Sequence, residues 1–101
     1  MIKAIADVCV VPIGVGVSVS KYVVVCEKIL RDAGLAPRLH AYGTNVEGDW
    51  DAVMKAVREC HERIHEMGAP RVSTSIRIGT RTDRDQTMQD KIDSVTSKIA
   101  D

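Results

Sequence analysis

The chain of 101 residues has no phenylalanine, one tryptophan and two tyrosines, so its apolar content comes from smaller side chains. Valine, isoleucine, alanine and methionine each bury a modest area, and a chain this short buries only roughly 60–65% of its unfolded surface. A length near 100 residues is typical of one domain. We therefore expect residues 1–101 to form a single domain that buries further surface by association with copies of itself.

An excess of either charge is also missing, because 14 Lys and Arg residues balance 14 Asp and Glu residues. A protein that neutralises many nucleic-acid phosphates normally carries a basic excess. We expect no nucleic-acid partner.

Long apolar runs are absent as well. Residues 1–17 are apolar, but Asp7 interrupts them and Pro12 and Gly14 end them, and no segment approaches the roughly 20 apolar residues of a membrane span. Cys9, Cys26 and Cys60 are odd in number and form no CxxC pair, as is usual for free thiols in a reducing compartment. These features predict a cytoplasmic protein with no membrane partner.

The period of the apolar residues switches between two and about 3.6 along the chain, which separates strands from helices. Strands are predicted at 2–13, 37–42, 44–47 and 71–81, and helices at 19–33, 50–67 and 87–100. Helix caps are predicted at Ser18 or Ser20, at Asp49, and as a capping box of Thr87 with Asp90.

This order is β-α-β-β-α-β followed by a C-terminal helix, which predicts an α+β fold of the ferredoxin-like type with a four-stranded antiparallel sheet. Right-handed crossovers place the first two helices on one side of that sheet and leave the other side open. The open face would carry a polar set too mixed for a core, which suits a dimer interface or a ligand floor. Its members are Asp7, Cys9, His40, Ser73, Ser75 and Arg77.

His61 to His65 spell H-E-x-x-H, the helical pattern of zinc hydrolases. A zinc site needs a third protein ligand, and His40 is the only other histidine. His61 also falls on the apolar stripe of its helix with Trp50 and Ile64, which we expect in the core. We therefore expect no metal and no catalytic residue, and a zinc hydrolase that uses His61 and His65 is a remote alternative.

Two further groups have a structural and a functional interpretation. Arg71, Arg77, Arg81 and Arg84, with Thr80 and Thr82, could hold a phosphate, although pairing with Asp83, Asp85 and Asp90 is the more common outcome for such clusters. Glu47 precedes a helix start, where the dipole favours a carboxylate. With Thr44 nearby, it could instead bind the amino group of a heterocyclic ligand.

Three segments resemble the small thiamine-binding, YkoF-related proteins, namely Val11-Pro12-Ile13-Gly14, the stretch from Gly43 to Trp50, and Arg71 through Asp83. The likeness is strongest to single-domain members of this family, including a fungal branch with the same Gly-Thr-Arg-Thr-Asp run at residues 79–83. The resemblance implies a ferredoxin-like fold, protomers that pair through their sheets into dimers and tetramers, and binding of thiamine or its hydroxymethylpyrimidine half. It implies no catalytic activity.

Together these observations predict a non-catalytic homo-oligomer, dimeric or tetrameric through its sheet, that binds thiamine, hydroxymethylpyrimidine or a phosphate form and needs no other cofactor. The resemblance nominates Thr44 and Glu47 as ligand-binding residues, and the open face of the sheet adds Asp7, His40, Ser73 and Arg77. An interaction protein without a ligand is the main alternative.

Overall fold

The computed structural model describes residues 2–99 and places seven elements in the order that the sequence predicts. The strands are β1 (Lys3–Ile13), β2 (Arg38–His40), β3 (Gly43–Asp49) and β4 (Arg71–Thr80), and the helices are α1 (Ser20–Asp32), α2 (Trp50–Glu66) and α3 (Met88–Ile99). The sheet has the order β2-β3-β1-β4, and all three pairings are antiparallel. The ferredoxin-like α+β prediction is confirmed, whereas Ala100, the predicted end of the last helix, lies outside the described residues.

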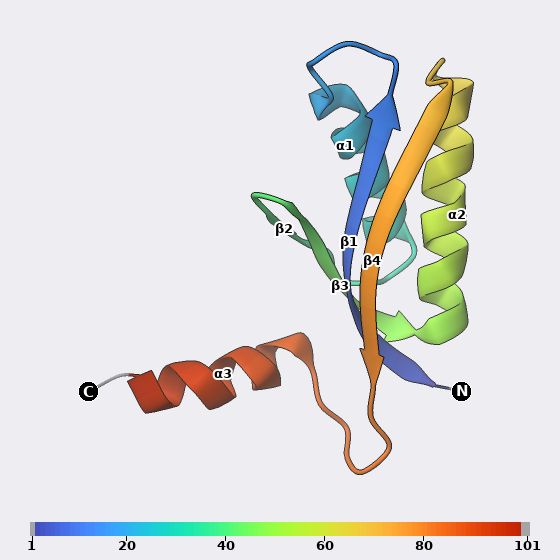
Figure 1. Cartoon of the computed structure of the whole chain (residues 1–101). Helices are drawn as coiled ribbons and strands as arrows, with labels where there is room; N and C mark the ends of the chain where they lie inside the picture. Colours follow the sequence, from blue (N-terminus) through green and yellow to red (C-terminus); the bar gives the residue numbers. More distant parts are fainter. Residues whose placement is uncertain (1, 100–101) are drawn as a thin grey trace.

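The alternation of side chains along β1 divides the molecule into a covered and an open face. Ala4, Ala6 and Val8 are almost fully buried, while Ile5 and Asp7 between them are only half-buried. Helices α1 and α2 lie behind the sheet in Figure 1 and cover the first set. The small side chains of β1 let these helices approach closely, and the larger core side chains come from the other elements. They are Leu30, Leu35, Val46, Val53, Cys60 and Ile64.

The buried stripe of α2 differs from the predicted one. It runs through Val53, Ala56, Cys60 and Ile64 at the spacing of one helical face. Trp50, at the first position of the helix, is 37% exposed, so its predicted place in the core is wrong. Because α2 begins where β3 leaves the sheet, its first residue has no covering element and the stripe starts one turn later.

The thiols behave as predicted for structural cysteines. Cys26 on α1 and Cys60 on α2 are buried and unoxidised, and Cys9 is half-buried on the open face. A hydrogen bond with the Cys26 thiol and burial between the helices both raise the pKa of Cys60. These two thiols therefore pack as small apolar groups where the helices meet.

The helix caps follow the predictions only in part. Thr87 and Asp90 form the predicted reciprocal box, with each backbone N–H donating to the other side chain at 3.0 Å. For α1 the capping position is Val19 with no side-chain bond, so the serine cap is wrong. Asp49 occupies the capping position of α2 but its carboxylate makes no capping bond. Trp50 instead donates its backbone N–H to the carbonyl of Ile2 at 2.7 Å.

Helix α3 leaves the body of the molecule and extends away from the sheet in Figure 1. Only Met88 at its start is buried. The apolar side chains that follow remain 46, 57 and 69% exposed, and they are Ile92, Val95 and Ile99 respectively. None of the helices among residues 2–99 has the length and apolar character of a membrane span.

Replacement of Gly43 by alanine tests how tightly β3 lies against β1. A β-carbon at Gly43 would lie 2.7 Å from the carbonyl oxygen of Val8, while one at Gly79 in β4 would meet nothing within 4 Å. We expect Gly43→Ala to lower the free energy of unfolding by about 1–3 kcal/mol, as overpacking does. Gly79→Ala is the matched control and should leave it nearly unchanged in urea denaturation. Equal stability of the two variants would contradict this packing.

Candidate functional site

A cavity of about 620 Å³ opens on the uncovered face of the sheet, at the end where α3 begins. Its floor comes from β1 and β4, and its walls come from β2, β3, the loop 81–86 and α3. The polar and charged residues that line it are Lys3, Asp7, His40, Asn45, Arg77, Thr80, Arg81, Arg84, Asp85, Gln86 and Lys91.

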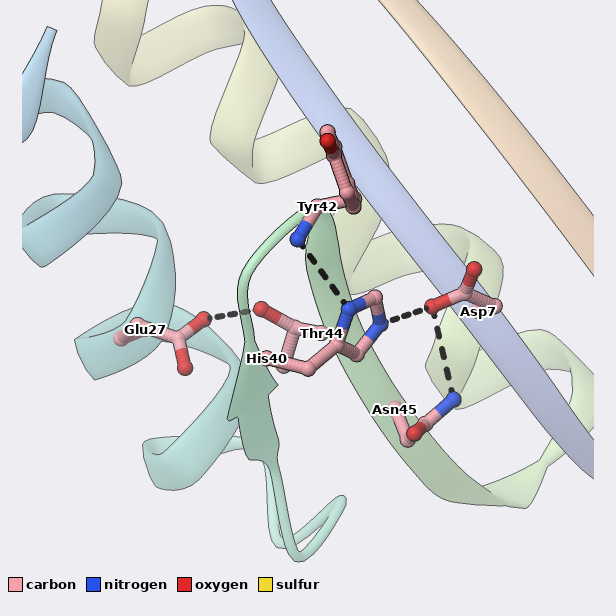
Figure 2. A network of polar contacts seen from close by, with 6 residues as sticks. All are labelled: Asp7, Glu27, His40, Tyr42, Thr44 and Asn45. Carbon is pink, nitrogen blue, oxygen red and sulfur yellow. Dashed lines mark hydrogen bonds and ion pairs between the residues drawn. The ribbon is translucent and has the colours of Figure 1, made fainter.

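Three polar side chains from three adjacent strands, Asp7, His40 and Asn45, meet at one end of this cavity. Asp7 on β1 is the direct register partner of Asn45 on β3 and of Arg77 on β4, and directly opposed residues share one face of a sheet. The Asp7 Oδ1 atom accepts hydrogen bonds from His40 Nε2 at 2.6 Å and from Asn45 Nδ2 at 3.4 Å (Figure 2). Because both bonds described here end on Oδ1, the second carboxylate oxygen can accept from a ligand.

The hydrogen bonds of His40 define its tautomer. The backbone N–H of Tyr42 donates to Nδ1 at 3.2 Å, so Nδ1 carries a lone pair and the ring proton lies on Nε2. Nε2 then donates to Asp7 (Figure 2). With both ring nitrogens engaged, the imidazole holds the carboxylate in place and is poorly suited to act as a general base.

The opposite end of the cavity is cationic. Arg81 is bound by Asp83, whose carboxylate oxygens lie 2.6 and 2.7 Å from its guanidinium, and this contact lowers the pKa of Asp83. Lys3, Arg84 and Lys91 at this end have no carboxylate within ion-pair distance among residues 2–99, and neither does Arg77 beside Asp7. The pKa of Asp90 is lowered first by its bonds to Thr87 and further by the positive potential of Arg84 and Lys3.

Glu47 attaches α3 to the sheet. It is the register partner of Ile5, so its side chain points to the open face, where Oε2 accepts a 2.7 Å hydrogen bond from the backbone N–H of Met88. A carboxylate at this position also interacts favourably with the helix dipole. Arg38 on β2 adds a 2.7 Å bond to Gln89. Glu47 therefore lies at the start of a helix, as predicted, but this helix is α3 and not α2.

The remaining two nominated residues lie elsewhere. Thr44 points to the helix-covered side, is 5% exposed, and donates its hydroxyl to Glu27 Oε2 on α1 at 2.7 Å (Figure 2). Ser73 lies on the open face but pairs with Val11, four residues along β1 from Asp7 and hence roughly 13 Å away. The structure thus brings Asp7, His40 and Arg77 together in the cavity, keeps Glu47 at its border, and places Thr44 and Ser73 outside it.

The two histidines of the H-E-x-x-H pattern make separate structural contacts. His61 Nε2 contacts the hydroxyl of Thr74 on β4, and His65 Nδ1 lies 2.8 Å from the carbonyl oxygen of Ala69, to which it donates. His61 is half-buried and His65 is exposed. No group of three or more His, Cys, Asp or Glu side chains within residues 2–99 is placed to hold a metal ion.

A second hollow of similar size lies between α1 and α2, on the side away from the sheet. Its charged residues alternate in sign, and they are Lys28, Asp32, Lys55, Glu59 and Arg63. Mixed exposed charges at this spacing are typical of solvated helix surfaces. The open-face cavity, where polar groups from separate strands converge, is the better candidate site.

Sequence reasoning missed Asn45, Lys3 and Lys91 as cavity residues. Asn45 and Glu47 lie on one face of β3, and Lys3 shares its face of β1 with Asp7, so strand alternation contains a signal for both. The position of Lys91 depends on the direction in which α3 leaves the loop. No local pattern encodes that direction.

Relatives of known sequence support the family resemblance. Residues 6–96 match the family model described as thiamine-binding protein. A UPF0045 protein of Synechocystis is 60% identical over 93 residues, which cover 92% of this chain and 77% of that protein. The UPF0045 protein ECM15 of the fungus Eremothecium gossypii is 45% identical, with 99% and 96% of the two chains covered.

Solved structures agree with the fold. A hypothetical protein of Methanocaldococcus jannaschii superposes with a TM-score of 0.88 at 34% identity, covering 95% of this chain and 98% of that one. A protein of Thermotoga maritima, provisionally described as a thiamine biosynthesis/salvage protein, has a TM-score of 0.76 at 18% identity, with 91% and 97% covered, and shares the fold. The chain belongs to the thiamine-binding protein family, and with it to the UPF0045 group of proteins.

Proposed function

We propose that this chain is a non-catalytic homo-oligomer that binds thiamine or its hydroxymethylpyrimidine moiety in the open-face cavity. The observation that carries the proposal is the cluster of Asp7, His40 and Asn45, three polar side chains from three strands that meet at one end of a cavity. Its volume of about 620 Å³ lies within the range of small-molecule sites.

The chemistry of the cluster suits an aminopyrimidine. Such a ring offers an exocyclic amine as donor and ring nitrogens as acceptors. Asp7 supplies a carboxylate acceptor, Asn45 supplies both an amide acceptor and donors, and the bond from His40 fixes the orientation of the carboxylate. Arg77, directly across β4, adds a cationic donor. Gly79 on β4 has no side chain, and a β-carbon there would meet nothing within 4 Å, which leaves room for a ring.

The other nominated residues support the site indirectly in this proposal. Glu47 holds the start of α3 against the sheet and so fixes one wall of the cavity. The hydrogen bond from Thr44 to Glu27 joins β3 to α1 and so helps to position the strand that carries Asn45. Ser73 lies on the part of the open face that remains for subunit pairing.

A binding role without catalysis fits the same geometry. The imidazole of the cavity has both nitrogens committed to Asp7 and to the Tyr42 backbone. His61 and His65 are occupied by contacts that support α2 and its C-terminal turn. The family description as a binding protein points the same way.

Self-association is favoured by two uncovered apolar surfaces. Val11 and Ile13 are 42 and 37% exposed on the end of the open face away from the cavity, and α3 presents Ile92, Val95 and Ile99 as one exposed seam. An amphipathic helix normally buries such a seam. We assign both surfaces to contacts with further copies of the chain, through the sheet as the sequence predicts. A protein whose whole function is this assembly is the second candidate.

Asp7→Asn is the direct test of the ligand site. Loss of a charge-assisted hydrogen bond should weaken binding of hydroxymethylpyrimidine roughly 10–100-fold in isothermal titration calorimetry. Asp32→Asn on the exposed surface of α1 is the matched control and should bind like the unaltered chain. No binding of thiamine or hydroxymethylpyrimidine to the unaltered chain at millimolar ligand would refute the proposed ligand and favour the assembly-only function.

Thr44→Val separates support from direct binding. The variant keeps the side-chain shape but leaves the half-buried Glu27 carboxylate without its donor, which should cost about 1–3 kcal/mol of unfolding free energy. Ligand affinity should change less than twofold while the fold is intact. Thr82→Val in the exposed loop is the control for stability. A large loss of affinity with unchanged stability would instead make Thr44 a direct ligand contact.

Ile92→Glu tests the seam of α3. A charge in place of an isoleucine that the proposed subunit contact would bury should raise the subunit dissociation constant at least roughly 10-fold, because one such side chain contributes about 1.5–3 kcal/mol when buried. Light scattering over a dilution series measures this shift. Ser94→Glu adds the same charge to the same helix at another exposed position and should leave the oligomer intact. Identical dissociation curves for the two variants would place the subunit contact elsewhere.

A further inference from the structure

The open-face cavity has two chemically different ends. One end holds the Asp7 cluster, which is matched to a heterocyclic amine. At the other, three cationic side chains from three parts of the chain line the cavity, and they are Lys3 of β1, Arg84 of the loop and Lys91 of α3. Lys3 and Asp7 stand four residues apart on β1, so roughly 13 Å of strand separates the ends at the backbone. A small ligand held at Asp7 can meet the cationic end because lysine and arginine side chains are long and reach inward from the backbone.

The carboxylates nearby leave these cations available. Asp83 forms an ion pair with Arg81, and Asp90 accepts a hydrogen bond from Thr87 in the capping box. The positive charges of Arg84 and Lys3 also lower the pKa of Asp90, after the larger effect of its bonds to Thr87. Among the residues that line the cavity, five side chains are cationic and only Asp7 and Asp85 are anionic. A concave surface lined by one sign of charge concentrates the field and attracts the opposite charge.

We propose that the cationic end is a phosphate subsite, so that the cavity selects the phosphate monoester of the pyrimidine over the free alcohol. This inference rests on the proposed function for the heterocyclic end. A phosphate monoester carries a charge of about −1.5 to −2 near neutral pH and accepts several charge-assisted hydrogen bonds. Arginine and lysine side chains from a strand, a loop and a helix can surround its oxygens.

The same charges discriminate between the two halves of thiamine. Its thiazolium ring is permanently positive, so unphosphorylated thiamine would place a cation beside Lys3, Arg84 and Lys91. Hydroxymethylpyrimidine is neutral, and its phosphate is an anion. The expected order of affinity is therefore hydroxymethylpyrimidine phosphate first, hydroxymethylpyrimidine second and thiamine last, with thiamine monophosphate above thiamine.

Isothermal titration calorimetry of the full chain with these four compounds, at low ionic strength, tests the order. We expect the phosphate group to tighten binding of the pyrimidine by at least about 10-fold. Added salt should reduce this difference in affinity, because ions screen the solvent-exposed cations of the cavity. Equal affinity for hydroxymethylpyrimidine and its phosphate would overturn the subsite and leave the proposed function standing.

Variants locate the effect. Arg84→Gln and, independently, Lys91→Gln should each lower affinity for the phosphate several-fold while affinity for the free pyrimidine stays within about twofold. Arg58→Gln on the exposed surface of α2 removes one positive charge far from the cavity and should reproduce the unaltered chain. A uniform loss for both ligands, or the same loss in Arg58→Gln, would contradict a local subsite. Circular dichroism of each variant verifies that it is folded.

Pyrophosphate serves as a probe that does not depend on the heterocycle. If none of the four compounds binds, the proposed function fails, and pyrophosphate binding followed by thermal shift then decides the subsite alone. Stabilisation by pyrophosphate that is lost in Arg84→Gln but kept in Arg58→Gln would support the anion site. No stabilisation, or stabilisation equal in both variants, would overturn it.

Discussion

The alternation of side chains along β1 is the constraint on which the rest of the structure depends. β1 pairs with both β3 and β4, so its pleat determines which residues of all three strands face the helices and which face outward. Its small residues, Ala4, Ala6 and Val8, allow α1 and α2 to pack closely on one face. The residues that alternate with them point to the opposite face, where Asp7 lies beside Asn45 and Arg77. One strand therefore sets the core and the candidate site together.

Much of this was predictable because strand phase is a local property. The alternating apolar residues of β1 and β4 predict the open face and, on it, Asp7 and Arg77, and the order of elements predicts the topology. Thr44 and Glu47 show where the prediction stopped. They are three residues apart in one strand, so they cannot share a face, and only the pairing with Val8 and Ile5 tells which of them points outward.

The features that escaped prediction depend on long-range geometry. Trp50 and Val53 both fit the apolar period of α2, but the edge of the sheet decides which of them is covered. The course of α3 depends on one hydrogen bond from Met88 to Glu47, 41 positions earlier in the chain, and on a second from Arg38 to Gln89. These bonds place Lys91 at the cavity. The local sequence near residue 91 does not predict that Lys91 lies at the cavity.

The proposed function requires a pyrimidine to bind in the cavity beside Asp7. A crystal structure of the chain grown with saturating hydroxymethylpyrimidine tests it most directly. We expect a ring in the open-face cavity, with its exocyclic amine within hydrogen-bond distance of the second carboxylate oxygen of Asp7 and of the Asn45 amide oxygen. A ligand bound between α1 and α2, or on the helix-covered side near Thr44 and Glu27, would contradict it.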